Sequence, residues 1–316
     1  MSTAPGTVSA VVDSADGHAG KRTLGVLARL ESVRLARHPM FLAATGLGVF
    51  VSVMALNAQA DQATAETLGA PAVAFTLGIG TMIATYHQTR SFRRADELVE
   101  SAPTTTTMRT AALCLAALVP ALVASGWLIF KYGVKPAALN TPEWMYGPFS
   151  HLDIAWVLAA NSVVAVMGGA LLGIAAGRWW RFRGAAVLLV VSVALWTLGN
   201  GAALSTGGAM PAWQRWTRLF SPVTFFSTSS QNNEHVDSFN GSPGWHLVWL
   251  VTLCVLAAIA ALLWRAEGRA RRRLVRIGAM ALAMSAVVYV LAATGGISQT
   301  VRSYPDGHSV VVSVTP

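Results

Sequence analysis

Two histidine–aspartate pairs offer the most direct metal-binding chemistry in this 316-residue sequence. His151 stands two residues before Asp153, and His235 stands two residues before Asp237. Residues two apart in an extended segment share a face, so either pair could supply two ligands to a cation. Two-ligand pairs are common by chance. We therefore interpret all four side chains as surface polar groups and expect no metal.

Motifs for nucleotide hydrolysis and covalent catalysis are missing from the sequence. The segment GHAGKR at residues 17–22 lacks the spacing of a P-loop and has Arg22 where that motif requires serine or threonine. Neither a Gly-x-Ser-x-Gly elbow nor a His-Glu-x-x-His pair occurs. We expect a protein that is not an enzyme and has no cofactor of its own. If ATP drives it, another chain binds the ATP and Mg²⁺.

The elements that position these residues are long apolar blocks. The chain is 54% hydrophobic and only 12% charged, with a mean hydropathy of +0.52, which is outside the range of soluble domains. Crossing a bilayer takes about 20 apolar helical residues. Seven blocks reach or approach that length: 40–56, 68–86, 110–130, 152–177, 184–204, 245–264 and 277–297. Because lipid offers the backbone no hydrogen-bond partner, each block must be helical. The sequence predicts an all-α, polytopic membrane bundle of about seven transmembrane helices.

The distribution of basic residues predicts the orientation of this bundle. Lys and Arg concentrate on the cytoplasmic side of membrane proteins. With the N-terminus inside, eighteen of the 23 basic residues lie on that side. The reverse orientation inverts the ratio, so we predict an N-in, C-out topology. The net charge of +9 and the isoelectric point near 10.4 then match an anionic inner leaflet, and no nucleic-acid partner is needed.

The topology divides the chain into four parts. Residues 1–20, rich in small and polar types, are expected to form a disordered cytoplasmic tail. Residues 21–39 precede the first span, and residues 40–297 form the transmembrane domain. Residues 298–316 form an extracytoplasmic tail, whose segment HSVVVSVTP is β-prone and could pair with a neighbouring edge.

The segment before the first span has the pattern of an interfacial helix. Apolar residues recur at helical spacing in TLGVLARLESVRLARHP, and Pro39 ends the pattern where the chain turns into the bilayer. Such a helix lies in the membrane interface. A basic juxtamembrane anchor without a role in transport has the same pattern, and the sequence does not separate the two.

A charged loop, RSFRRADELVESAP at residues 90–103, follows the second apolar block on the cytoplasmic side. Its acids come early in a short stretch of helix formers, where the helix dipole favours them, and Pro103 ends that stretch. We interpret it as a short amphipathic helix that docks on a soluble partner. The alternative is an ordinary positive-inside loop kept soluble by its acids.

The outer segment before the sixth block, MPAWQRWTRLFSPVTFF at residues 210–226, is rich in Trp and Phe. Such residues settle at the level of the lipid headgroups. Its two prolines predict short helices that dip into the outer leaflet. A plain aromatic belt is the alternative.

Together these features resemble the permease subunits of ABC-2-type transporters, a family of bacterial drug, antibiotic and polysaccharide exporters. The matching segments are LARLESVRLARHP, the charged loop with its continuation TTTTMRTAALCLA, and LFSPVTFF, within residues 23–264. The resemblance implies that two permease subunits pair in the bacterial plasma membrane, each with a separate cytosolic ATPase. It also implies that the loop transmits closure of the ATPase to the spans, through Arg93, Arg94, Asp96, Glu97, Glu100 and Pro103. A seventh span after the basic segment RAEGRARRRLVR departs from the family pattern.

Polar residues within the apolar blocks are candidates for a substrate pathway. Asn161, Trp196 and Asn200 are the ones we single out, Asn200 because the glycines on either side would let its helix loosen. Side chains of this kind usually hydrogen-bond neighbouring helices, and that structural role is the first expectation for each.

The sequence therefore favours a seven-span permease that exports a drug-like or amphiphilic molecule, driven by a separate ATPase. The alternative is a membrane sensor or scaffold whose basic loops recruit a cytoplasmic signalling partner.

Overall fold

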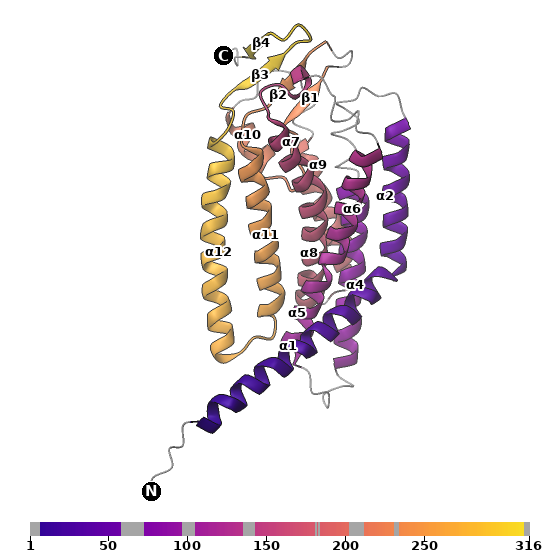
Figure 1. Ribbon diagram of the computed structural model, residues 1–316, viewed down its shortest axis with the longest axis vertical. Coiled ribbons are helices and arrows are strands. Elements are labelled where there is room, and N and C mark those ends of the chain that lie inside the picture. Colours follow the sequence, from indigo (N-terminus) through magenta and orange to yellow (C-terminus); the bar gives the residue numbers. More distant parts are fainter. Residues whose placement is uncertain are drawn as a thin grey trace.

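The computed structural model describes residues 7–57, 73–96, 105–134, 143–180, 182, 184–201, 212–230 and 234–312. Figure 1 shows upright helices with a small sheet at one end and helix α1 slanting across the other. We call these the sheet end and the α1 end. The elements in chain order are α1 (Thr7–Ala36), α2 (Pro39–Asn57), η1 (Ala74–Gly78), α4 (Ile79–Asp96), α5 (Thr106–Ala116), α6 (Leu118–Val134), η3 (Glu143–Tyr146), α7 (His151–Leu158), η4 (Ala159–Val164), α8 (Ala165–Trp179), α9 (Ala185–Gly201), α10 (Ala212–Leu219), β1 (Ser227–Ser229), β2 (Val236–Ser238), α11 (Pro243–Leu263), α12 (Gly268–Thr294), β3 (Thr300–Ser303) and β4 (Ser309–Val312).

Among the described residues, four helical stretches are long and apolar enough to cross a membrane: Thr106–Phe130, His151–Trp179, Pro243–Leu263 and Gly268–Thr294. A fifth results if Gly20–Ala36 and Pro39–Met54, which meet at a bend of 60°, are counted as one span. The apolar helix Ala185–Thr197 is shorter. The structure thus has helices at each of the seven predicted apolar blocks, of which four to five qualify as spans by length and composition. They fit a multi-pass membrane protein.

Local sequence explains where the long helical stretches begin and break. Thr105 accepts a hydrogen bond from the Met108 N–H and caps α5. The break between α5 and α6 falls just before Pro120, which has no N–H to continue the hydrogen-bond ladder. Ser150 and Asp153 form a reciprocal capping box at the start of α7. The sharp turn from α11 into α12 ends at Gly268, whose φ of 55° favours glycine.

Helices α4 and α8 lie backbone to backbone at the centre of the bundle. A Cβ on Gly169 would stand 2.7 Å from the Gly78 carbonyl oxygen, and a Cβ on Gly173 would stand 2.2 Å from that of Met82. Thr85 Oγ1 also donates across the interface to the Ala170 carbonyl, at 3.0 Å. The small residues of the MGGALLGIAAG segment therefore pack within this chain, as small residues do where membrane helices approach closely.

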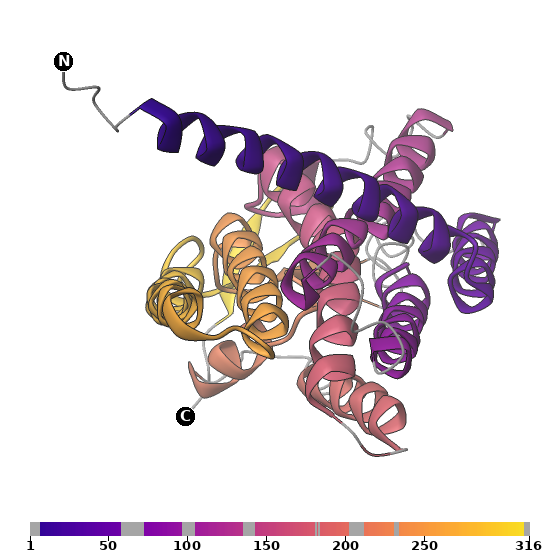
Figure 2. The same cartoon turned by 90° about the horizontal axis from the view of Figure 1, so that it is seen from below.

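Helix α1 is longer than the predicted interfacial helix. It begins at Thr7, inside the segment predicted to be a disordered tail, and runs without a break to Ala36. Figure 2, seen from below, shows α1 lying across the ends of the upright helices, and it packs most extensively against α5. Helix α2 then turns upright at Pro39.

The prediction of an all-α fold is wrong at the sheet end, where four short strands form an antiparallel sheet in the order β1-β2-β3-β4. Strand β2 pairs with β3, and the α11–α12 hairpin lies between these two strands in the sequence. Part of the β-prone tail does form a strand, β4. It pairs with β3 of the same chain, where the sequence suggested a neighbouring edge. Of the short helices predicted in the aromatic outer segment, one is present, α10, and the described residues that follow it up to Phe226 form no second helix. The dip of α10 into the outer leaflet stays a prediction.

Candidate functional site

An apolar cavity of about 370 Å³ lies within the helix bundle. Its walls come from η1, α4, α8, α9 and α11 and from the loop that follows α10. None of the described residues that line it is charged; the larger ones include Phe75, Met82, Leu172, Trp196, Val223, Leu250 and Leu253. A ligand site of this volume and character suits an apolar or amphiphilic molecule and offers nothing to hold an ion.

Two π-helical segments flank the cavity. Ala74, Phe75 and Gly78 of η1 line it, and so does Val164 at the end of η4. A π-helical turn is wider than an α-helical one and frequently occurs at functional sites, because it interrupts the regular ladder. Both segments continue into α-helix, η1 into α4 and η4 into α8. The helices that meet most closely in the bundle are therefore irregular where they border the cavity.

Trp196 is the predicted pathway residue that lines the cavity. Its ring lies 5.5 Å from that of Phe220, measured between centroids. Phe220 in turn contacts Trp249 at 5.7 Å and Tyr289 at 5.8 Å. These aromatic rings connect the cavity wall to α11, through Trp249, and to α12, through Tyr289. The neighbouring Thr197 hydroxyl donates to the Val193 carbonyl of its own helix, at 2.9 Å.

Asn161 has a structural partner instead of a place in the cavity wall. Its Nδ2 donates to the Thr224 carbonyl at 2.8 Å, and its Oδ1 accepts from the Thr224 N–H at 3.1 Å. The side chain is only 2% exposed. This reciprocal pair ties η4 to the loop before β1 and matches the structural role expected first. Asn200 lies on α9, but its side chain is outside the described residues.

The predicted docking loop is described in part. The backbone of Arg93, Arg94 and Asp96 forms the last turns of α4, so the helix extends into the charged segment without a break. The side chains of these three residues are outside the described part of the chain, and so are Glu97, Glu100 and Pro103 altogether. The docking role stays a prediction.

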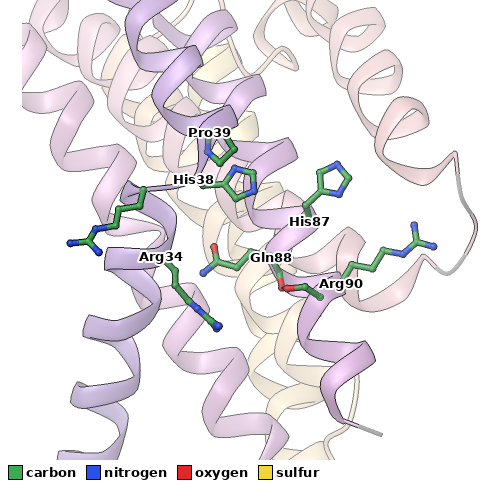
Figure 3. A pocket seen from close by; sticks show the side chains of 8 residues that line it. Arg34, His38, Pro39, His87, Gln88 and Arg90 are labelled. Carbon is green, nitrogen blue, oxygen red and sulfur yellow. The ribbon is translucent and has the colours of Figure 1, made fainter. Parts of the chain in front are cut away.

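A second pocket, of about 690 Å³, lies at the α1 end and was missed in the sequence (Figure 3). It is lined by Arg34, Arg37, His38, Pro39, His87, Gln88, Arg90 and Ser91. In the sequence, its arginines stood out only as basic residues of segments predicted to be cytoplasmic. What brings them together is the packing of the end of α1 against α4, about which a linear pattern says nothing. Burial and the nearby His87 lower the pKa of His38 below its ordinary value.

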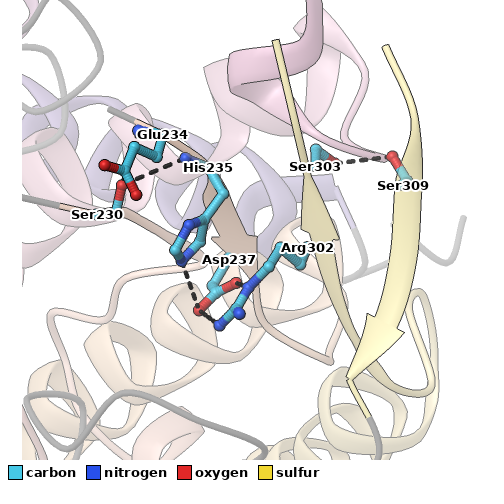
Figure 4. A network of polar contacts seen from close by, with 7 residues as sticks. All are labelled: Ser230, Glu234, His235, Asp237, Arg302, Ser303 and Ser309. Carbon is cyan, nitrogen blue, oxygen red and sulfur yellow. Dashed lines mark hydrogen bonds and ion pairs between the residues drawn. The ribbon is translucent and has the colours of Figure 1, made fainter. Parts of the chain in front are cut away.

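The sheet end holds a network of charged groups (Figure 4). Arg302 binds Asp237 with two hydrogen bonds, from Nε at 2.7 Å and from Nη2 at 2.9 Å. This bond raises the pKa of Arg302. Arg218 is buried nearby, donates to the carbonyls of Phe225 and Asn240, and lies over the ring of Phe226. Arg218 and Arg302 thus join loops and strands of the protein. Among the described residues, their contacts leave no open site for a ligand.

The histidine–aspartate pairs of the sequence have other partners. Asp153 caps α7 through Ser150. Asp237 is bound by Arg302, while the His235 Nε2 stands 3.9 Å from its nearer oxygen. In the described part of the chain, no group of three or more potential metal ligands occurs.

Comparison with known proteins identifies no relative: no family model, no curated protein and no solved structure matches this chain.

Proposed function

We propose that this protein is the membrane-spanning permease subunit of an ATP-driven exporter of the ABC-2 type, with a drug-like or amphiphilic substrate. The observation that supports this most is the uncharged cavity inside the bundle, bordered by η1 and η4. An apolar molecule in such a site makes favourable contacts without any charge to neutralise. The irregular helical segments give the cavity wall a place at which it can change shape.

The proposal includes a topology of seven spans in the bacterial plasma membrane, N-in and C-out. Figure 1 shows α1, the first described helix, at one end of the bundle and β4, the last described strand, at the other, which suits an odd number of crossings. The α1 end would then face the cytoplasm, which agrees with the basic α11–α12 turn found there. A separate cytosolic ATPase would dock at that end, on the segment after α4, and a second permease subunit would complete the transporter.

Purification of the tagged full-length chain from its native membranes tests the partner. We expect an ATPase with a P-loop to co-purify in stoichiometric amount and to bring vanadate-sensitive ATP hydrolysis. A clean preparation with no nucleotide-binding partner would refute the exporter and leave the sensor or scaffold as the better hypothesis.

Two valines on α9 allow a matched test of the cavity. Val193 lines it, whereas Val191 is 45% exposed on the outer side of the same helix. Val193→Trp should fill the cavity and abolish stimulation of the complex's ATPase by an uncharged apolar fluorescent dye. Val191→Trp makes the same change in volume and should leave stimulation intact. Equal behaviour of the two variants would exclude this cavity as the substrate site.

A further inference from the structure

The pocket at the α1 end is formed where three elements meet. The last turn of α1 supplies Arg34, the junction supplies His38 and Pro39, and α4 supplies Gln88 and Arg90. Figure 3 shows the Gln88 side chain pointing into the space between His38 and Arg34, with His87 and Arg90 farther along α4. A volume of about 690 Å³ is ample for a phosphate group and its substituents.

The charge of the pocket is positive and only partly balanced. Its lining includes three arginines and no carboxylate. Glu31 lies beside the pocket. Its carboxylate is buried, accepts a hydrogen bond from Gln88 and forms an ion pair with Arg34 at 3.5 Å. Within the described residues, no acidic side chain pairs with Arg37 or Arg90. Among the described residues, the Arg90 Nη1 donates to two neutral oxygens, those of the Tyr86 hydroxyl at 3.1 Å and the Phe182 carbonyl at 3.4 Å. The planar guanidinium is the side chain that best matches phosphate oxygens.

Gln88 adds a buried acceptor that still needs a donor. Its Nε2 donates to the Glu31 carboxylate at 2.6 Å, and because a carboxylate only accepts, the amide orientation is determined. The opposite atom, Oε1, is buried with no hydrogen-bond partner in the described part of the chain, on a side chain that is 8% exposed. A ligand that brings a hydroxyl together with its phosphate would satisfy this atom.

Apolar surface leads up to the pocket. Val26, Leu30 and Val33 follow one another at helical spacing on α1, and their exposed fractions are 70%, 53% and 42%. Arg37 continues the same face one turn later and reaches the pocket. Exposed apolar side chains also cover the start of α2, at Met40 and Leu42. A soluble anion would leave these apolar surfaces uncovered, whereas acyl chains would cover them.

We propose that this pocket binds the headgroup of an anionic phospholipid, a phosphodiester that also carries a free hydroxyl, as in phosphatidylglycerol. Figure 3 shows the Arg90 guanidinium directed away from Gln88 and His38, so on binding it turns inward and holds the phosphate together with Arg37. The headgroup hydroxyl donates to Gln88 Oε1, and the acyl chains lie against α1 and α2. The site does not depend on the proposed transport function, because it rests only on contacts at the α1 end.

Native mass spectrometry of the purified full-length chain in detergent tests the site. The protein is incubated with an equimolar mixture of phosphatidylglycerol, phosphatidylethanolamine and phosphatidylcholine, and the lipid retained is measured. We expect selective retention of phosphatidylglycerol, reduced roughly tenfold for each arginine removed in Arg37→Gln/Arg90→Gln. The matched control is Arg272→Gln/Arg273→Gln, which removes two exposed arginines of α12 outside the pocket.

The control decides between a built site and diffuse charge. Loss confined to the pocket variant supports the site. Equal loss in both variants, or no loss in either, overturns it. Should the glutamine variant fail to fold, Arg37→Lys/Arg90→Lys keeps the charge and loses the two-pronged phosphate contact. We expect this variant to retain less phosphatidylglycerol than Arg272→Lys/Arg273→Lys, and equal retention would also overturn the proposal.

A competition arm distinguishes lipid from soluble phosphate. Glycerophosphoglycerol, the deacylated form of phosphatidylglycerol, offers the same phosphodiester and headgroup hydroxyls without acyl chains. We expect an excess of it to leave the bound lipid in place. Displacement at concentrations comparable to the lipid would overturn the lipid assignment in favour of a soluble phosphate ester.

Discussion

Gln88 donates a hydrogen bond of 2.6 Å to the carboxylate of Glu31, a residue 57 positions earlier in the chain. The same amide also reaches the Glu31 backbone carbonyl, at 3.3 Å. Both side chains are buried, Glu31 at 4% exposure and Gln88 at 8%. The slanting helix α1 is thereby held to the upright helix α4 by a buried polar contact.

Removal of this contact should destabilise the fold because it leaves a buried carboxylate without its donor. We expect Gln88→Leu to lower the free energy of unfolding by about 3 kcal/mol. Glu31→Gln keeps an acceptor for Gln88 and removes the buried charge, so its cost should stay below about 1 kcal/mol. Denaturant titration in mixed micelles measures both. Equal stability of the two variants would show that the contact does not hold α1.

The junction between α1 and α2 should be sensitive to acid. His38 precedes Pro39, and its Nδ1 accepts a hydrogen bond from the Met40 N–H at 3.3 Å, which caps α2. Burial, and next the neighbouring His87, lower the pKa of His38 from 6.5, so the folded protein binds this proton less tightly than the unfolded chain. The stabilisation is therefore complete above the unfolded pKa and is lost as the pH falls below it through the folded pKa.

The measurement is the thermal unfolding midpoint from about pH 8 to about pH 5. We expect the midpoint of the wild type to fall over this range by more than that of His38→Asn, whose side-chain oxygen caps the helix without titrating. Arg34, Arg37, His87 and Arg90 also face His38, so His87→Gln serves to separate the second histidine. A pH profile that is the same in wild type and His38→Asn would rule out His38 as the titrating group.

Close approach of α4 and α8 should make Gly173 intolerant of a side chain. A Cβ there would stand 2.2 Å from the Met82 carbonyl oxygen and 2.3 Å from the Thr85 hydroxyl, so the helices must separate. Gly173→Ala should cost about 2 kcal/mol or more. Gly126→Ala is the matched control, since no atom lies within 4 Å of its Cβ position, and it should be neutral or stabilising by up to about 1 kcal/mol. If the two substitutions have the same effect on unfolding, the backbone contact is not tight.

Charge reversal tests the docking loop. If the acids after α4 contact the ATPase, Glu97→Lys/Glu100→Lys turns two attractions into repulsions. Substrate export should then fall at least tenfold, which corresponds to a loss of only about 1.4 kcal/mol in binding free energy. The protein should remain in the membrane at normal abundance. Glu267→Lys reverses an exposed acid just before α12 and should export normally. Normal export by a well-expressed double variant would refute the assignment of a coupling role to this loop.

Apolar blocks predicted where helices form, because the bilayer requires each long apolar stretch to satisfy its own backbone. The pattern did not predict the π-helical turns η1 and η4, whose sequences AFTLG and AANSVV read as ordinary helix. Nor did it predict the start of α1 at Thr7, where Gly and Asp suggested disorder. The sheet was missed because three-residue strands such as STS and VDS have no apolar alternation. Strand β4, with three consecutive valines, was the exception.

The candidate sites divide in the same way. Trp196 could be singled out because a large ring with an N–H in an apolar block is conspicuous, and it does line the cavity. Asn161 was conspicuous as a polar residue in an apolar block, but its side chain bonds Thr224, 63 residues away. The basic pocket joins residues of α1 to residues of α4, and only tertiary packing brings them together.

The pairing of β2 with β3 has a consequence for how the protein is made. Both strands lie at the sheet end, and the hairpin of α11 and α12 separates them in the sequence. The ribosome completes β1 and β2 first, but their partner β3 emerges only after both long helices. In the proposed topology, the sheet can close, and Asp237 can bind Arg302, only after α11 and α12 have both been inserted and β3 has reached the side of the membrane that holds β2. In that topology, closure of this sheet is a late step of biogenesis, and it takes place only in chains whose last two described helices have entered the membrane in the correct orientation.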